Sequence, residues 1–158
     1  MAEDSMPLID KIRHDLNQAL KSSNEEVVRT LRFLLSEVHN LTVAKYPPEK
    51  GGLPEGGLPD QDIIAVIQKL VKTHKESIEA FKKGQREDLV KKEEAELEIL
   101  NHYLPRQLSY EEIRKKVEEC QKMGIKDFGQ MMREVMAKVK GQAEGGEVAK
   151  IVKEVLGE

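Results

Sequence analysis

The sequence predicts an all-α protein in two parts, an N-terminal helical hairpin domain followed by a small C-terminal three-helix domain. Aliphatic residues recur every three or four positions along most of the chain, which is the period of an amphipathic helix. With 39% hydrophobic, 35% charged and only 4% aromatic residues, the composition is that of long amphipathic helices. Helix-start and helix-stop residues become more closely spaced after Pro105, so we expect domains over residues 1–104 and 105–158.

Two helices are predicted in the first 46 residues. The first runs from about Leu8 to Lys21, with its aliphatic residues on one face. Ser23 followed by Glu26 is the pattern of a capping box, in which the two side chains satisfy each other's backbone N–H groups. We therefore expect a second helix to start there and to end before Pro47.

Residues 46–59 interrupt the helical pattern. The segment contains four prolines and four glycines, so it cannot continue a helix, and its few apolar residues predict a flexible loop. Asp60 is then a suitable N-cap for a long helix, which Gly84 is expected to end in a left-handed conformation. An acid-rich helix follows and stops at Pro105.

The C-terminal part shows three helix starts. Ser109 with Glu112 forms a second capping box, and Asp127 with Gln130 repeats the start pattern. A glycine-rich segment that we expect to be a loop precedes the last apolar run; its glycines are Gly141, Gly145 and Gly146.

Charge and cysteine content limit the functions to consider. The net charge of −3 argues against a protein that wraps nucleic acid over its whole surface. From Pro105 onward, however, there are 11 Lys and Arg against 10 Asp and Glu, compared with 15 against 19 before it. The C-terminal part is thus better suited to contact a polyanion. Cys120 is the only cysteine, which excludes a disulfide framework and a thiolate cluster for zinc.

We expect a soluble, cytoplasmic protein. A single cysteine fits a reducing compartment, and residues 1–9 contain acids but neither an apolar run nor a basic leader. No stretch approaches the roughly 20 apolar residues of a membrane span.

No catalytic constellation is recognisable, and we expect no catalytic residue, metal or cofactor. The sequence has neither a Gly-x-Ser-x-Gly elbow nor a phosphate-binding loop that follows a strand. His74 falls on the apolar stripe of its helix, where a core or boundary histidine is expected rather than a ligand. Glu96 and Glu98 lie on different sides of their helix, and the acids around them are expected to form a solvated face. Cys120 occupies an apolar position and is expected to pack.

The turn before the last helix is the remaining candidate site. Lys138 and Lys140 end one helix, and Lys150 and Lys153 lie one and two turns into the next. Backbone N–H groups at a helix start, flanked by lysines, suit a nucleic-acid phosphate. The alternative is an ordinary glycine-rich connection between helices with a solvated charged face.

Three stretches carry a family resemblance. One runs from Glu98 to Ser109 and contains a Tyr-Leu-Pro turn; another covers residues 128–136 and 140–145; the third is Gly84, Gln85, Arg86, Asp88 and Leu89. Together they resemble the YqeY family, whose members are similar to the tail region of the B subunit of the glutamine-dependent aspartyl/glutamyl-tRNA amidotransferase (the GatB/YqeY domain). The resemblance covers nearly the whole chain apart from residues 46–59.

The resemblance implies a helical, two-part protein related to an appendage that helps to hold tRNA, while the chemistry of that enzyme resides in other domains and subunits. The family's Lys-Gly-Lys-Ala-Asp-Gly turn falls on residues 140–145. Here Gln142 replaces a Lys, which removes one cation, and Glu144 replaces an Asp. Ala149 stands where the family usually has Asn.

Three functions follow. The first is a non-catalytic tRNA-binding or tRNA-amidotransferase-associated module, with tRNA and amidotransferase or tRNA-synthesis components as partners and no membrane. The second, by analogy, is a carbon–nitrogen ligase with glutamine as amido donor, and the third is a protein–protein interaction module. The residues expected to contact RNA in the first case are Arg133, Lys138, Lys140, Gly141, Gln142, Gly145, Lys150 and Lys153.

Overall fold

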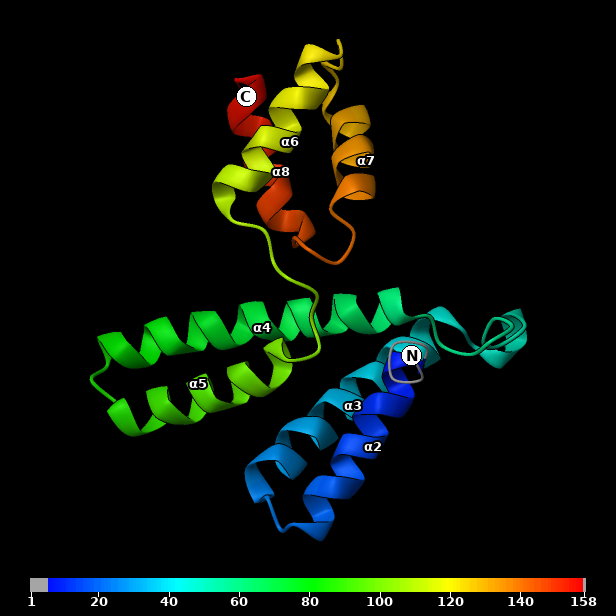
Figure 1. The fold of residues 1–158 in the computed structure, drawn as a ribbon, viewed down its shortest axis with the longest axis vertical. Coiled ribbons are helices and arrows are strands. Elements are labelled where there is room, and N and C mark those ends of the chain that lie inside the picture. Colours follow the sequence, from blue (N-terminus) through cyan, green and yellow to red (C-terminus); the bar gives the residue numbers. More distant parts are fainter. Residues whose placement is uncertain (1–5, 158) are drawn as a thin grey trace. The chain divides into compact units, whose positions relative to one another are not determined.

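The computed structural model describes residues 6–157 as seven α-helices and one short 3-10 helix without a strand, which confirms the all-α class (Figure 1). These residues belong to two compact units, residues 1–103 and 104–158. None of the described helices combines the length and the apolar character that crossing a membrane requires. The elements are α2 (Leu8–Lys21), α3 (Glu25–Lys45), η1 (Pro48–Lys50), α4 (Asp60–Lys83), α5 (Glu87–Asn101), α6 (Tyr110–Lys122), α7 (Phe128–Lys138) and α8 (Gly145–Leu156).

The N-terminal unit contains the four predicted helices, arranged as two helical hairpins. Helices α2 and α3 pack against each other, and α4 and α5 run side by side (Figure 1). Helix α3 also packs against both α4 and α5, which joins the hairpins around one apolar core. Burial of each large aliphatic side chain contributes about 1.5–3 kcal/mol. Fully buried members of this core are Ile12, Leu31, Leu34, Ile63, Ile67 and Leu100.

Two helix starts differ from the prediction. Asn24, not Ser23, caps α3: its side chain accepts a hydrogen bond from the backbone N–H of Val27, and Ser23 adopts a left-handed φ of 56° that completes the preceding turn. Asp60 does not cap its own helix. Its Oδ1 accepts from the backbone N–H of Leu8 at 2.9 Å, so this carboxylate caps α2, an element 52 residues away.

The turn between α4 and α5 also differs. Gly84 has a φ of −84°, and the left-handed residue is Gln85, with a φ of 56°. The backbone N–H of Arg86 donates to the carbonyl of Phe81 at 2.9 Å and closes the turn. The chain therefore reverses within a few residues, and α5 returns along α4.

The loop between the hairpins is closed at its base. Asp62 accepts hydrogen bonds from Lys45 Nζ at 2.6 Å and from the Tyr46 hydroxyl at 2.5 Å. Burial alone would raise the pKa of the Asp62 carboxyl, but these two donors lower it below its ordinary value. Helix η1 forms one turn within the loop, and the predicted flexibility of residues 46–59 stays a prediction.

Tyr103, from the Tyr-Leu-Pro turn, joins the end of α5 to α2. Its ring is buried, and its hydroxyl donates to Asp15 Oδ2 at 2.6 Å. Burial, reinforced by the neighbouring carboxylate, raises the pKa of this phenol far above its ordinary value, so the hydroxyl stays a donor. A residue of the family motif thus has a structural role.

The C-terminal unit is a three-helix bundle with the predicted start signals. The Ser109 hydroxyl accepts from the N–H of Glu112 at 3.2 Å, and Asp127 Oδ2 accepts from the N–H of Gln130 at 2.9 Å, which confirms both caps. Cys120 is buried, as expected of a packing residue. The buried core consists of Ile113, Val117, Cys120, Met131, Val135, Val139, Ala143, Val148, Ile151 and Val152.

Replacing Tyr103 by Phe should lower the free energy of unfolding by about 1.5–3 kcal/mol, because a part-buried hydrogen bond to a carboxylate is lost while the ring is kept. Urea denaturation followed by circular dichroism measures the change. The matched control is Tyr110→Phe, since the Tyr110 hydroxyl also contacts a carboxylate, that of Glu154, but the side chain is exposed. We expect the control substitution to lower the free energy of unfolding by about 0.5 kcal/mol. Equal effects of the two substitutions would contradict this role of Tyr103.

Candidate functional site

The turn before α8 is held by the segment that precedes α6. Gly141 has a left-handed φ of 72°, and its carbonyl accepts from Gln107 Nε2 at 2.8 Å. The carbonyl of Gln142 accepts from the N–H of Leu108, also at 2.8 Å. The backbone carbonyls of Gly141 and Gln142 therefore position the turn, whether or not the turn also contacts RNA.

A carboxylate occupies the start of α8. The Glu144 side chain accepts from the N–H groups of Gly146 at 3.1 Å and Glu147 at 3.2 Å. A Cβ at Gly146 would lie 3.0 Å from this carboxylate, so the glycine permits the close approach. Gly145 and Gly146, predicted in the loop, are the first residues of the helix. The N–H groups proposed to meet a phosphate are thus bonded to a carboxylate of the chain itself, which the helix dipole favours.

Two of the predicted lysines contact their own unit. Lys138 Nζ lies 3.8 Å from the Sγ of the buried Cys120 on α6. Lys153 Nζ lies 5.8 Å from the centre of the Phe128 ring at the start of α7, within the range of a cation–π contact. The two ammonium groups therefore approach different elements, Lys138 the helix α6 and Lys153 the start of α7.

Three predicted cations are available to a ligand. Arg133, Lys140 and Lys150 are exposed, and none of the ion pairs in the described part of the chain involves them. Lys150 and Lys153 are three residues apart on α8, so they share one side of the helix. The three exposed cations thus belong to α7 (Arg133), to the turn (Lys140) and to α8 (Lys150).

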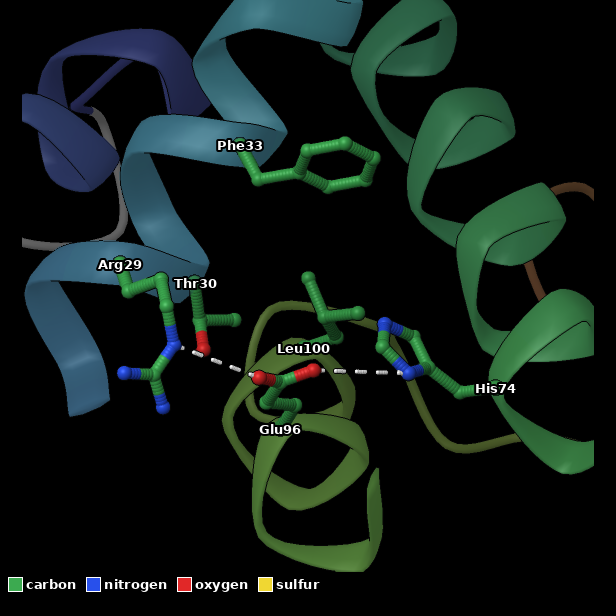
Figure 2. A pocket seen from close by; sticks show the side chains of 6 residues that line it. All are labelled: Arg29, Thr30, Phe33, His74, Glu96 and Leu100. Carbon is green, nitrogen blue, oxygen red and sulfur yellow. Dashed lines mark ion pairs between the residues drawn. The ribbon is translucent and has the colours of Figure 1, made fainter. Parts of the chain in front are cut away.

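A second site, not predicted from the sequence, lies in the N-terminal unit. The Nδ1–H of His74 on α4 donates to the carboxylate of Glu93 on α5 and lies 3.8 Å from Glu96 Oε2. The other oxygen of Glu96 lies 3.6 Å from the Nε of Arg29 on α3 (Figure 2). The three side chains of His74, Glu93 and Glu96 are between 13% and 20% exposed, so the polar cluster is largely shielded from water.

A cavity of about 260 Å³ adjoins this cluster. Figure 2 shows residues of α3 on one side, His74 of α4 opposite them, and Glu96 and Leu100 of α5 between. Phe33 is 53% exposed and gives the cavity an apolar wall. The cavity therefore combines an acid, an imidazole and a guanidinium with apolar surface. It is lined by Arg29, Thr30, Phe33, His74, Glu96 and Leu100.

The register of the hairpin could have revealed this cluster. His74 and Glu96 are both 11 residues from Gln85, the centre of the turn, so an antiparallel pair of helices places them opposite each other. Glu93 precedes Glu96 by three residues and shares its side of α5. The expectation of a solvated face was wrong for these two acids, because α4 covers them. His74 is a boundary histidine, as expected, but with acidic partners.

The fold is that of an all-helical, two-part protein, as the resemblance to the YqeY family implied. It consists of two packed hairpins, a Tyr-Leu-Pro turn and a three-helix unit with capped helices. The family model of Yqey-like proteins matches residues 9–156, so the chain belongs to this family.

Relatives are found in fungi. Altered inheritance of mitochondria protein 41, mitochondrial, of Pyrenophora tritici-repentis is 31% identical over 95% of this chain and 81% of its own length. The protein of the same name in Saccharomyces cerevisiae (strain YJM789) is 24% identical over 95% of this chain and 69% of its own length. An uncharacterized protein of Schizosaccharomyces pombe is 33% identical over 62% of this chain and 72% of its own length.

The relatives overturn the expected cytoplasmic location. The proteins that match 95% of this chain in Pyrenophora and Saccharomyces are named as mitochondrial. The prediction depended partly on a single cysteine, and a lone buried thiol is compatible with any reducing compartment, so it cannot distinguish the cytosol from the interior of an organelle.

Replacing Glu144 by Ala should lower the free energy of unfolding by about 1 kcal/mol, because α8 loses the acceptor for its first N–H groups. Thermal unfolding followed at a helical circular-dichroism band measures the change. Glu134→Ala on an exposed part of α7 is the control and should stay within about 0.5 kcal/mol of the parent. No difference between the two variants would show that the cap does not stabilise the unit.

Proposed function

We propose that this chain is a non-catalytic RNA-binding module whose C-terminal unit contacts tRNA phosphates. The observation that carries the proposal is the set of exposed cations without ion pairs on α7, on the α7–α8 turn and on α8, namely Arg133, Lys140 and Lys150. The resemblance to the tail of the tRNA amidotransferase supports tRNA as the ligand and the amidotransferase as an associated partner. The names of the fungal relatives support a mitochondrial setting.

Side chains, not backbone groups, make the contacts in this proposal. Glu144 bonds to the N–H groups at the start of α8, and its negative charge repels a phosphate there. Lysine and arginine side chains can still reach phosphates from the surrounding surface. Such contacts neutralise phosphate charge without reading bases, so binding should be insensitive to sequence and strongly dependent on salt.

The alternative function, a glutamine-dependent ligase, would need a nucleophile to attack the glutamine amide, and the chain's one thiol does not serve as one. Cys120 is 1% exposed and packs in the core of the C-terminal unit, so it is not placed to attack a glutamine amide. A binding role agrees better with the described residues.

A double substitution tests the proposed surface. Lys140→Ala with Lys150→Ala should weaken binding of bulk tRNA to a similar extent for every tRNA species. It should also flatten the dependence of log Kd on log salt by about two units, one for each lost phosphate contact. Filter binding at two salt concentrations measures both effects.

The control is a pair of lysine substitutions elsewhere. Lys75→Ala with Lys122→Ala removes the same charge from exposed positions on α4 and α6 and should leave the salt slope closer to that of the parent. Equal losses in the two double variants would mean that only net charge matters. Failure of the parent protein to retain tRNA at low salt would refute RNA binding itself.

A further inference from the structure

The cluster of His74, Glu93 and Glu96 places three metal-binding side chains together. The imidazole nitrogen and one oxygen of each carboxylate all lie within 4.8 Å of one another. The sequence predicted no metal site, because the three residues belong to two helices and only the hairpin register unites them. We propose that this cluster binds a divalent transition-metal cation of the Zn²⁺ type, independently of RNA binding.

The donor types select the class of metal. An imidazole nitrogen suits Zn²⁺ and its first-row neighbours better than Mg²⁺ or Ca²⁺, which prefer oxygen ligands alone. Two carboxylates bring negative charge that offsets the charge of a divalent ion. Zinc sites that bind a water or a small ligand have three protein ligands and one open coordination position. The three side chains of this cluster could supply the same number of ligands.

The distances are close to those that a metal needs. Bonds of about 2.0–2.2 Å to a tetrahedral ion place its ligand atoms roughly 3.3–3.6 Å apart. His74 Nδ1 and Glu96 Oε2 are 3.8 Å apart. Glu93 is hydrogen-bonded directly to His74 Nδ1, so its carboxylate must move outward to admit the ion. The Nδ1 proton leaves for Nε2 or for solvent when the metal takes its place, so metal binding displaces the hydrogen bond to Glu93.

Two neighbouring features fit a metal site. The Arg29 Nε lies 3.6 Å from Glu96 Oε1, which leaves Oε2 directed toward His74 (Figure 2). Partners of this kind orient ligating carboxylates in metal sites. The adjoining cavity of about 260 Å³ has room for a water or a small ligand in the open position. Phe33 and Leu100 provide the apolar part of its lining.

Co²⁺ is the probe for this site, because it replaces Zn²⁺ and gives visible absorption when bound. The full chain, without a histidine tag and after treatment with a chelator, is titrated with Co²⁺ and then with Zn²⁺. We expect saturation at one Co²⁺ per chain and loss of the absorption when Zn²⁺ displaces it. Mg²⁺ in excess should displace neither ion.

Variants identify the ligands. His74→Asn and Glu96→Gln should each weaken Co²⁺ binding by at least about tenfold. The matched controls are His39→Asn, an exposed histidine on α3, and Glu98→Gln, an exposed acid on α5, and both should bind as the parent does. Circular dichroism establishes that each variant keeps its helical content.

Two results would overturn the proposal. One is the absence of saturable Co²⁺ or Zn²⁺ binding by the parent chain, which would leave the cluster as an ion-pair network that joins α4 to α5. The other is binding that the control substitutions reduce as much as those at His74 and Glu96, which would place the metal elsewhere. The parent titration needs no variant, so it decides the matter even where a substitution unfolds the protein.

Discussion

The turn between α4 and α5 determines which side chains of these two helices meet. Gln85 takes a left-handed conformation, and the hydrogen bond from Arg86 to the Phe81 carbonyl reverses the chain at once. His74 and Glu96 then face each other at equal distances from the turn. A shift of one residue would rotate Glu96 by about 100° around its helix and remove it from the cluster. The cavity and the polar cluster of His74, Glu93 and Glu96 therefore depend on this short reversal.

In the C-terminal unit, the N-terminus of each helix is capped by a side chain of the same unit. Ser109, Asp127 and Glu144 each accept hydrogen bonds from the first N–H groups of their helices. These side chains remove the open helix ends that could have held an anion. Any polyanion that binds here must be met by flexible cationic side chains, whose contacts are individually weak and easily screened by salt.

Local features of the fold could be predicted from the sequence, and features that need a distant partner could not. The caps at Ser109 and Asp127 were predictable because each acceptor lies three residues from its donor. Asp60 has the same chemistry, yet it caps a helix that starts at Leu8, and no local pattern indicates this. The lysines near the α7–α8 turn can be named from the sequence, and their contact with RNA stays a prediction. The His74 cluster could not be named from residue types alone, because its members become neighbours only when the hairpin closes.

The hydrogen bonds at the base of the 46–59 loop have a consequence for the length of that loop. Lys45 and Tyr46 donate hydrogen bonds to Asp62, and Asp60 accepts one from the first residue of α2. These contacts, and not the loop itself, fix the position of the first hairpin against the start of α4. Loop length adds little to the cost of bringing the ends together, about 0.6 kcal/mol for each doubling. Insertions or deletions within the loop should therefore change the stability of the N-terminal unit little, because the contacts at its base stay the same.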